Sequence, residues 1–129
     1  MKSEYLFVYG TLMGKFPGNP LHHELLLSGE YLEETTVSGS LYLIDSYPGY
    51  IPVGTGQVHG ELWTIHRADY LFPILDSYED VNLEQPSSGE YRRELVPVRT
   101  TQNTRVEAWI YIYQGSLEDK IKLESGYFL

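Results

Sequence analysis

The sequence contains no cysteine. Disulfide bonds, thiolate nucleophiles and cysteine-ligated metal centres are therefore all excluded. The sequence also lacks an apolar run of the ~20 residues that a membrane-spanning helix needs. The apolar stretch nearest the N-terminus, residues 5–8, is too short for the core of a signal peptide. We therefore expect a cytoplasmic protein and no membrane partner.

Basic residues are scarce. Nine Lys and Arg residues stand against 18 Asp and Glu residues, which gives a formal net charge of −9. No nucleic-acid partner is expected, because phosphate binding needs a clustered positive surface. The 129 residues, 42% of them hydrophobic, indicate one compact domain, 1–129, that buries about two-thirds of its unfolded surface. An anionic ligand would need local positive groups to bind against this overall field.

The most informative segment joins an apolar strand to a glycine. Residues 5–8 form a continuous apolar run, which is typical of a strand buried on both faces. Gly10 then permits a sharp turn and a close approach of a ligand to the backbone. The amides of Gly10, Thr11 and Leu12 could point together at an anionic or carbonyl oxygen. The alternative is an ordinary strand end closed by a glycine turn.

A first helix is expected to begin at Asn19-Pro20, where Asn19 can act as the N-cap, and to end at Gly29. The adjacent pair His22-His23 lies within it. Neighbouring helical residues point about 100° apart, so these two rings cannot easily share one metal ion. No metal site is therefore predicted here.

Strands and a second helix are expected over most of the remaining chain. Residues 31–63 predict successive strands, separated by turns rich in Gly and Pro. The second helix is expected over residues 67–78, with Pro73 causing a kink or a late start. Two further strands are expected at residues 91–100 and 105–113, with a hairpin turn between them at Asn103. A C-terminal helix is expected from Ser116 onward.

Glu79 is the strongest candidate for chemistry. It follows the predicted second helix and lies between the carboxylates of Asp76 and Asp80. Neighbouring negative charge and partial burial both raise the pKa of a carboxyl group, toward general-base strength near neutral pH. The alternative, from the local sequence alone, is a solvated surface group at a helix end.

Six short motifs occur in the same order as in one known family. They are Val8-Tyr9-Gly10-Thr11-Leu12, Gly39-x-Leu41-Tyr42 with Tyr47-Pro48, Val58-x-Gly60-Glu61-Leu62-Trp63, Leu75-Asp76-x-x-Glu79, Tyr91-Arg92-Arg93 and Ala108-Trp109-x-Tyr111-x-Tyr113. Together they resemble the gamma-glutamyl cyclotransferase-like superfamily, particularly its branch of small bacterial proteins and gamma-glutamylamine cyclotransferases. The chain departs from the family at Asp80, since glycine usually follows the catalytic glutamate.

The resemblance implies an α+β fold, with a mixed, strongly curved or barrel-like β-sheet of about six strands and two or three short flanking helices. It implies release of 5-oxoproline and a free amine or amino acid from a γ-glutamyl amide, with Glu79 as general acid/base. No metal or organic cofactor is required. The Gly10 loop would hold either the tetrahedral oxyanion or the α-carboxylate of the small-molecule substrate, and Arg92 or Arg93 would be secondary candidates for the α-carboxylate. The expected substrate-binding residues are Tyr9, Gly10, Thr11, Leu12, Tyr47, Tyr91 and Arg92, although the tyrosines could equally be structural.

Two other functions remain open. One is a ligand-binding or interaction module that retains the fold and pocket without turnover; the other is hydrolysis of a γ-amide by water. The leaving group is also open: lysine, other amines, amino acids and glutathione-like peptides all fit. It is expected to contact Tyr47-Pro48 and residues 80–90. The tyrosine-rich strands could expose a patch for a homodimer, or they could fill the core.

Overall fold

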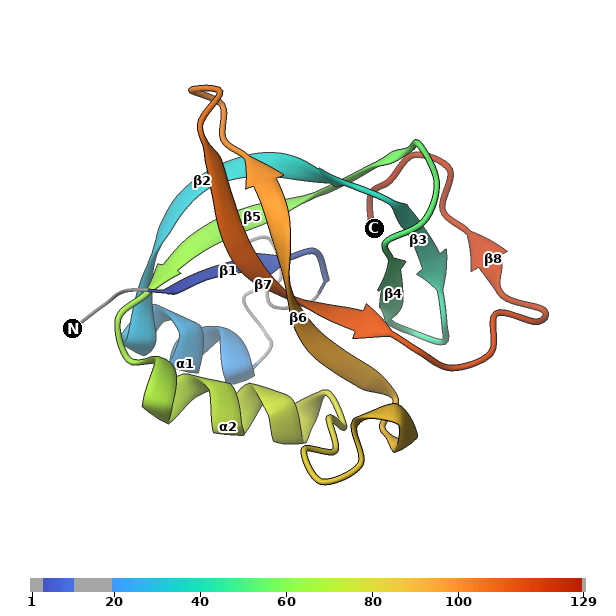
Figure 1. Cartoon of the computed structure of the whole chain (residues 1–129), viewed down its shortest axis with the longest axis horizontal. Helices are drawn as coiled ribbons and strands as arrows, with labels where there is room; N and C mark the ends of the chain where they lie inside the picture. Colours follow the sequence, from blue (N-terminus) through green and yellow to red (C-terminus); the bar gives the residue numbers. More distant parts are fainter. Residues whose placement is uncertain (1–3, 11–19, 129) are drawn as a thin grey trace.

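In this computed structural model, which describes residues 4–10 and 20–128, five strands close into a barrel (Figure 1). Their order round the barrel is β1 (Glu4–Val8), β5 (Gln57–Ile65), β2 (Gly29–Ser38), β6 (Tyr91–Arg99) and β7 (Arg105–Tyr113). Neighbours pair antiparallel except at the closure, where β1 pairs parallel with β7. The first strand is therefore bonded on both of its edges.

Three short strands extend the sheet from β7. They are β4 (Pro48–Ile51), β3 (Ser40–Leu43) and β8 (Ile121–Lys122). The described residues thus form eight strands, where the sequence predicted about six. The helix expected from Ser116 onward is wrong, because Ile121 pairs with Leu43 of β3 in an antiparallel ladder. The α+β class and the barrel-like sheet are confirmed.

The β1 strand is buried on both faces, as its continuous apolar run predicts. Leu6 and Val8 belong to the apolar cluster between the barrel and the helices. Phe7 and Tyr9 belong to the cluster inside the barrel. Burying an apolar side chain of this size contributes about 1.5–3 kcal/mol, so β1 holds the barrel and the helical layer together.

Two α-helices, α1 (Pro20–Ser28) and α2 (Ala68–Tyr78), lie side by side below the barrel in Figure 1. They bury Leu25, Leu71 and Leu75 completely. Because α2 begins at Ala68 and contains Pro73 in its interior, the late helix start considered from the sequence is wrong.

Gly29 follows the last residue of α1, but it is not a left-handed helix cap. It is the first residue of β2 and pairs with Ile65 of β5. A Cβ at this position would lie 2.2 Å from the carbonyl oxygen of Thr64. Glycine is therefore required by the close approach of two strands and not by the end of the helix.

The hairpin between β6 and β7 turns at Asn103, as predicted. Asn103 adopts φ 64°, a left-handed conformation that asparagine tolerates better than most residues. Its N–H donates to the carbonyl oxygen of Thr100 at 2.9 Å. A short 3₁₀ turn, η1 (Pro86–Ser88), interrupts the surface loop before β6. No helix in the described ranges 4–10 and 20–128 is long and apolar enough to cross a membrane.

Candidate active site

A cavity of about 360 Å³ opens where the end of β1 meets the end of α2 and the start of β6. Aromatic side chains form much of its wall, and two carboxylates, Glu79 and Glu90, line it. Its lining residues are Phe7, Val8, Tyr9, Gly10, Ser46, Tyr47, Pro48, Tyr78, Glu79, Glu90, Tyr91 and Tyr111. The cavity thus brings together five of the residues expected from the sequence: Tyr9, Gly10, Tyr47, Glu79 and Tyr91.

The other expected binding residues lie elsewhere. Thr11 and Leu12 fall outside the described residues. Arg92 does not line the cavity, and its guanidinium pairs with Glu94 on the protein surface. Gly10 lines the cavity, and a Cβ there would come within 3.1 Å of the Pro48 ring. The absence of a side chain therefore lets the chain after β1 approach the start of β4.

Glu79 is placed in the cavity by the end of α2. It is the C-cap residue, and its N–H donates to the carbonyl oxygen of Leu75 at 2.9 Å. Burial raises the pKa of its carboxyl group to about 7, and the negative charge of Glu90 adds to this rise. Within the described part of the chain, no hydrogen bond reaches this carboxylate. Glu79 is therefore an unpaired carboxyl group that titrates near neutral pH.

The neighbours expected to raise the pKa of Glu79 have other roles. Asp76 is buried and accepts two hydrogen bonds from Arg93, at 2.8 and 3.1 Å, and a third from the Tyr111 hydroxyl at 2.7 Å. The Arg93 guanidinium also lies over the rings of Phe72 and Trp109. Asp76 and Arg93 thus neutralise each other, which leaves Arg93 poorly placed to hold a substrate carboxylate.

Asp80 adopts φ 57°, a backbone conformation that favours glycine and that aspartate tolerates better than most other residues. This explains why glycine suits the position after the glutamate. The Asp80 side chain is exposed and does not line the cavity. Instead, its carbonyl oxygen and its carboxylate both accept the Glu90 N–H, at 3.0 and 3.2 Å. The side chain that stands here in place of glycine therefore does not crowd the cavity.

Tyrosine hydroxyls fix the cavity wall. The Tyr9 hydroxyl donates to the carbonyl oxygen of Tyr111 at 2.6 Å and accepts the Tyr50 N–H at 3.1 Å. The Tyr91 hydroxyl donates to the carbonyl oxygen of Pro48 at 2.7 Å. Burial, and then the charge of Glu79, raises the pKa of Tyr9, so this phenol stays neutral. Tyr9 and Tyr91 therefore act as neutral, rigid walls that tie β1, β4, β6 and β7 together.

Glu90 is a charged cavity residue that the sequence did not single out, although it lies within residues 80–90, which were expected to contact the leaving group. It precedes β6, and its carboxylate accepts a hydrogen bond from the Tyr47 hydroxyl. Its position depends on the irregular segment between α2 and β6, which hydrophobic periodicity cannot predict. Its place directly before Tyr91, which was itself expected in the pocket, was a further signal.

A metal site has no support within residues 4–10 and 20–128, where no group of three His, Asp or Glu residues could hold an ion. His22 is buried and packs edge-on against Trp63, whereas His23 is exposed. The two histidines of the pair therefore have different environments, in keeping with their divergent directions on a helix.

Comparison with known proteins places this chain in a family. The profile of the family "Gamma-glutamyl cyclotransferase, AIG2-like" matches residues 6–129. A protein of Citrobacter rodentium called "Gamma-glutamylcyclotransferase family protein ytfP" is 33% identical over 124 residues, which cover 96% of this chain and 94% of that protein. The chain belongs to the gamma-glutamyl cyclotransferase, AIG2-like family.

Solved structures agree with this assignment. The solution structure of ytfP from Escherichia coli superposes with a TM-score of 0.67 at 31% identity, covering 97% of this chain and 96% of that one. An aig2-like protein from Mus musculus gives a TM-score of 0.67 at 22% identity, covering 92% and 82% of the two chains. At that identity the likeness shows the fold, which these proteins share.

Proposed function

We propose that this protein is a γ-glutamyl cyclotransferase that releases 5-oxoproline from a γ-glutamyl amide, with Glu79 as its general acid/base. The observation that carries the proposal is an unpaired carboxyl group with a pKa of about 7 in the wall of the largely tyrosine-lined cavity. Membership of the gamma-glutamyl cyclotransferase, AIG2-like family supports the reaction class.

The reaction is an intramolecular aminolysis. Glu79 accepts a proton from the α-ammonium of the substrate, and the freed nitrogen attacks the γ-carbonyl carbon to close a five-membered ring. The ring nitrogen then gives up its second proton as the tetrahedral intermediate expels the amine, which takes up this proton and the one from Glu79 and leaves as an ammonium. Atoms and charge balance without a cofactor. A general base of this kind contributes on the order of 10²–10⁴ in rate, and holding the folded substrate supplies much of the remainder.

The pKa of Glu79 suits this role. A carboxyl group with an ordinary pKa is a weak acceptor for an ammonium proton, and raising its pKa to about 7 strengthens it while leaving about half of it ionised at neutral pH. The Gly10 backbone amide is the described candidate for binding the oxyanion or the α-carboxylate. The rigid tyrosine walls would keep the substrate folded against Glu79.

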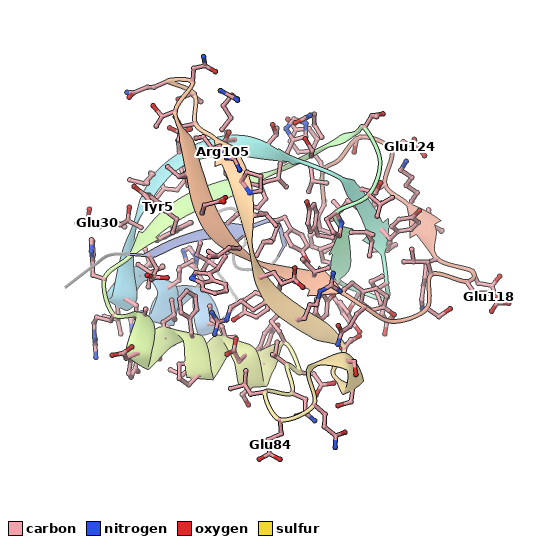
Figure 2. The ribbon with its side chains drawn as sticks, in the orientation of Figure 1. Tyr5, Glu30, Glu84, Arg105, Glu118 and Glu124 are labelled. Carbon is pink, nitrogen blue, oxygen red and sulfur yellow. The ribbon has the colours of Figure 1, made fainter. Side chains whose placement is uncertain are left out.

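The test is product formation by wild-type protein and by Glu79→Gln. Both are incubated with a panel of γ-glutamyl amides and γ-glutamyl amino acids, and 5-oxoproline is measured by mass spectrometry. Glu84→Gln, a change at an exposed loop residue (Figure 2) that does not line the cavity, is the matched control. We expect release by wild type and by the control, and a loss of at least about 100-fold in Glu79→Gln.

The alternatives give different results. A module that binds without turnover would bind panel members and release neither 5-oxoproline nor glutamate. Hydrolysis by water would yield glutamate, and it would survive blocking of the substrate's α-amino group by acetylation. Cyclisation would not survive that block, because the attacking nitrogen would no longer be available.

A further inference from the structure

The cavity presents two carboxylates to a substrate that itself carries an α-carboxylate. None of the described lining residues is Lys, Arg or His, and the whole chain has a net charge of −9. Among the described residues, only neutral donors are therefore available to the α-carboxylate. Apart from backbone amides such as that of Gly10, these donors are side-chain hydroxyls, which belong to Tyr9, Ser46, Tyr47, Tyr78, Tyr91 and Tyr111.

Four of the six hydroxyls already donate within the protein. Those of Tyr9 and Tyr91 donate to backbone carbonyl oxygens. Those of Tyr47 and Tyr111 donate to carboxylates. A phenol has one proton to donate, so none of these four can bind an anionic oxygen of the substrate without breaking its present hydrogen bond.

Tyr78 is the tyrosine of the wall that remains available. In the described part of the chain its hydroxyl makes no hydrogen bond. Tyr78 is also 54% exposed, whereas Tyr9 and Tyr91 are 6% and 3% exposed. It is the last residue of α2 and directly precedes Glu79, and both residues line the cavity. Tyr78 thus brings an exposed ring and an uncommitted donor to the wall beside the proposed general base.

Ser46 has the other lining hydroxyl without a hydrogen bond among the residues described. It directly precedes Tyr47, whose hydroxyl is bonded to the Glu90 carboxylate. The α-carboxylate of the substrate, by contrast, is attached to the same carbon as the amine that gives its proton to Glu79. It therefore lies close to Glu79, and the position of Tyr78 beside Glu79 favours Tyr78 over Ser46 as its donor.

We propose that Tyr78 is a substrate-binding residue, whose hydroxyl donates to the α-carboxylate of the γ-glutamyl amide. This inference rests on the proposed function of the cavity and adds a residue to it. A donor for the oxyanion would be preorganised and shielded from water, whereas Tyr78 is more than half exposed. Its hydroxyl therefore suits a charge that is present throughout the reaction. Loss of such a contact raises KM and leaves kcat unchanged.

Equilibrium binding tests the inference without turnover. The two ligands are γ-glutamylethylamide and N-ethyl-4-aminobutanamide, which is the same molecule without its α-carboxylate. Their dissociation constants are measured by nuclear magnetic resonance titration on Glu79→Gln, so that no ligand is consumed, and on the same variant with Tyr78→Phe added. We expect the added change to weaken binding of γ-glutamylethylamide about tenfold, because a hydrogen bond to a charged group is lost. Binding of the ligand without the carboxylate should not change.

Tyr70→Phe is the matched control, since Tyr70 is an exposed tyrosine of the same helix that does not line the cavity. It should leave both affinities unchanged. The inference is overturned if Tyr78→Phe weakens the two ligands equally, if it weakens neither, or if γ-glutamylethylamide does not bind at all. Each of these results would mean that the hydroxyl makes no contact specific to the α-carboxylate.

Kinetics give a second measurement. In the otherwise wild-type protein, Tyr78→Phe should raise KM about tenfold and keep kcat within about twofold. A fall in kcat at unchanged KM would assign the hydroxyl to the oxyanion and overturn the inference. The proposed function fails separately, by absence of 5-oxoproline from wild-type protein over the full panel, and the binding comparison does not depend on that result.

Discussion

Replacing Glu79 with glutamine is expected to stabilise this protein at alkaline pH. The folded protein raises the pKa of Glu79 from its ordinary value of 4.5 to about 7, whereas the unfolded chain does not. Between these two pH values the folded state holds a proton that the unfolded state has lost. The free energy of unfolding therefore falls by up to about 1.4 kcal/mol for each pH unit of increase across this window.

The full penalty follows from the size of the shift. Below about pH 4.5 the carboxyl group is protonated in both states and has no effect, and above about pH 7 it is ionised in both and the penalty is complete. The difference between 4.5 and about 7 corresponds to about 3 kcal/mol. Glutamine never ionises, so the free energy of unfolding of Glu79→Gln does not fall for this reason as the pH rises. For a domain of this size that gain raises Tm by roughly 10 °C at pH 8.

The assay is urea unfolding followed by circular dichroism at pH 4, 6 and 8, with Glu84→Gln as the control for loss of one exposed negative charge. The stability difference between Glu79→Gln and wild type should be near zero at pH 4, intermediate at pH 6 and largest at pH 8. A variant as stable as wild type at pH 8, or a difference that does not change with pH, would refute the assignment of a buried, unpaired carboxylate to the cavity.

Three further results are expected. For the proposed reaction, kcat/KM should rise about tenfold per pH unit below pH 7 and then level off as Glu79 loses its proton. The midpoint of this rise should lie at lower pH in Glu90→Gln, because that variant lacks the neighbouring negative charge. Asp76→Asn should lower the free energy of unfolding in urea by about 3–5 kcal/mol, because it leaves the half-buried Arg93 without its counter-charge. Gly29→Ala should destabilise the protein by about 1–3 kcal/mol, measured in the same way, because its Cβ would meet the Thr64 carbonyl oxygen at 2.2 Å.

Each of these results has a contrary outcome, and the Asp76 variant also has a matched control. If the pH profile of Glu90→Gln has the same midpoint as that of wild type, the charge of Glu90 does not raise the pKa of Glu79. For Asp76, the matched control is Glu94→Gln, which breaks the more exposed pair with Arg92 and should change stability by less than about 1 kcal/mol; equal effects of the two changes would contradict the buried-pair argument. A Gly29→Ala variant of wild-type stability would show that β2 and β5 can separate locally.

The parts of the fold that local patterns specify could be predicted from the sequence. The apolar run of β1, the position of α2 and the turn at Asn103 each depend on a few neighbouring residues, and each occurs as expected. Closure of the barrel could not be predicted in this way, because the parallel pairing of Leu6 with Trp109 joins residues far apart in the chain. The C-terminal segment was misassigned for the same reason, since strand formation depends on the partner strand more than on local propensity.

The candidate site shows the same division. Resemblance to the family placed Glu79, Tyr9 and Gly10 correctly in one cavity. It did not indicate which charge acts on Glu79, because Asp76 and Asp80 are nearer in sequence but are turned toward Arg93 and the Glu90 backbone. Sequence neighbours are poor guides to electrostatic neighbours where a helix ends and the chain reverses direction.

The tyrosine hydroxyls explain how the fold can hold an unpaired carboxyl group. A buried carboxylate without a partner normally draws in water or a nearby donor, because ionisation there is costly. Here the three tyrosines whose pKa is raised by the charge of Glu79 already donate elsewhere: the hydroxyls of Tyr9 and Tyr91 donate to backbone carbonyl oxygens, and that of Tyr111 donates to Asp76. None can donate to Glu79 without breaking a buried hydrogen bond. The raised pKa of Glu79 therefore depends on the whole cavity wall. Releasing any one of these hydroxyls from its present acceptor would let it donate to Glu79 and should lower the pKa of Glu79.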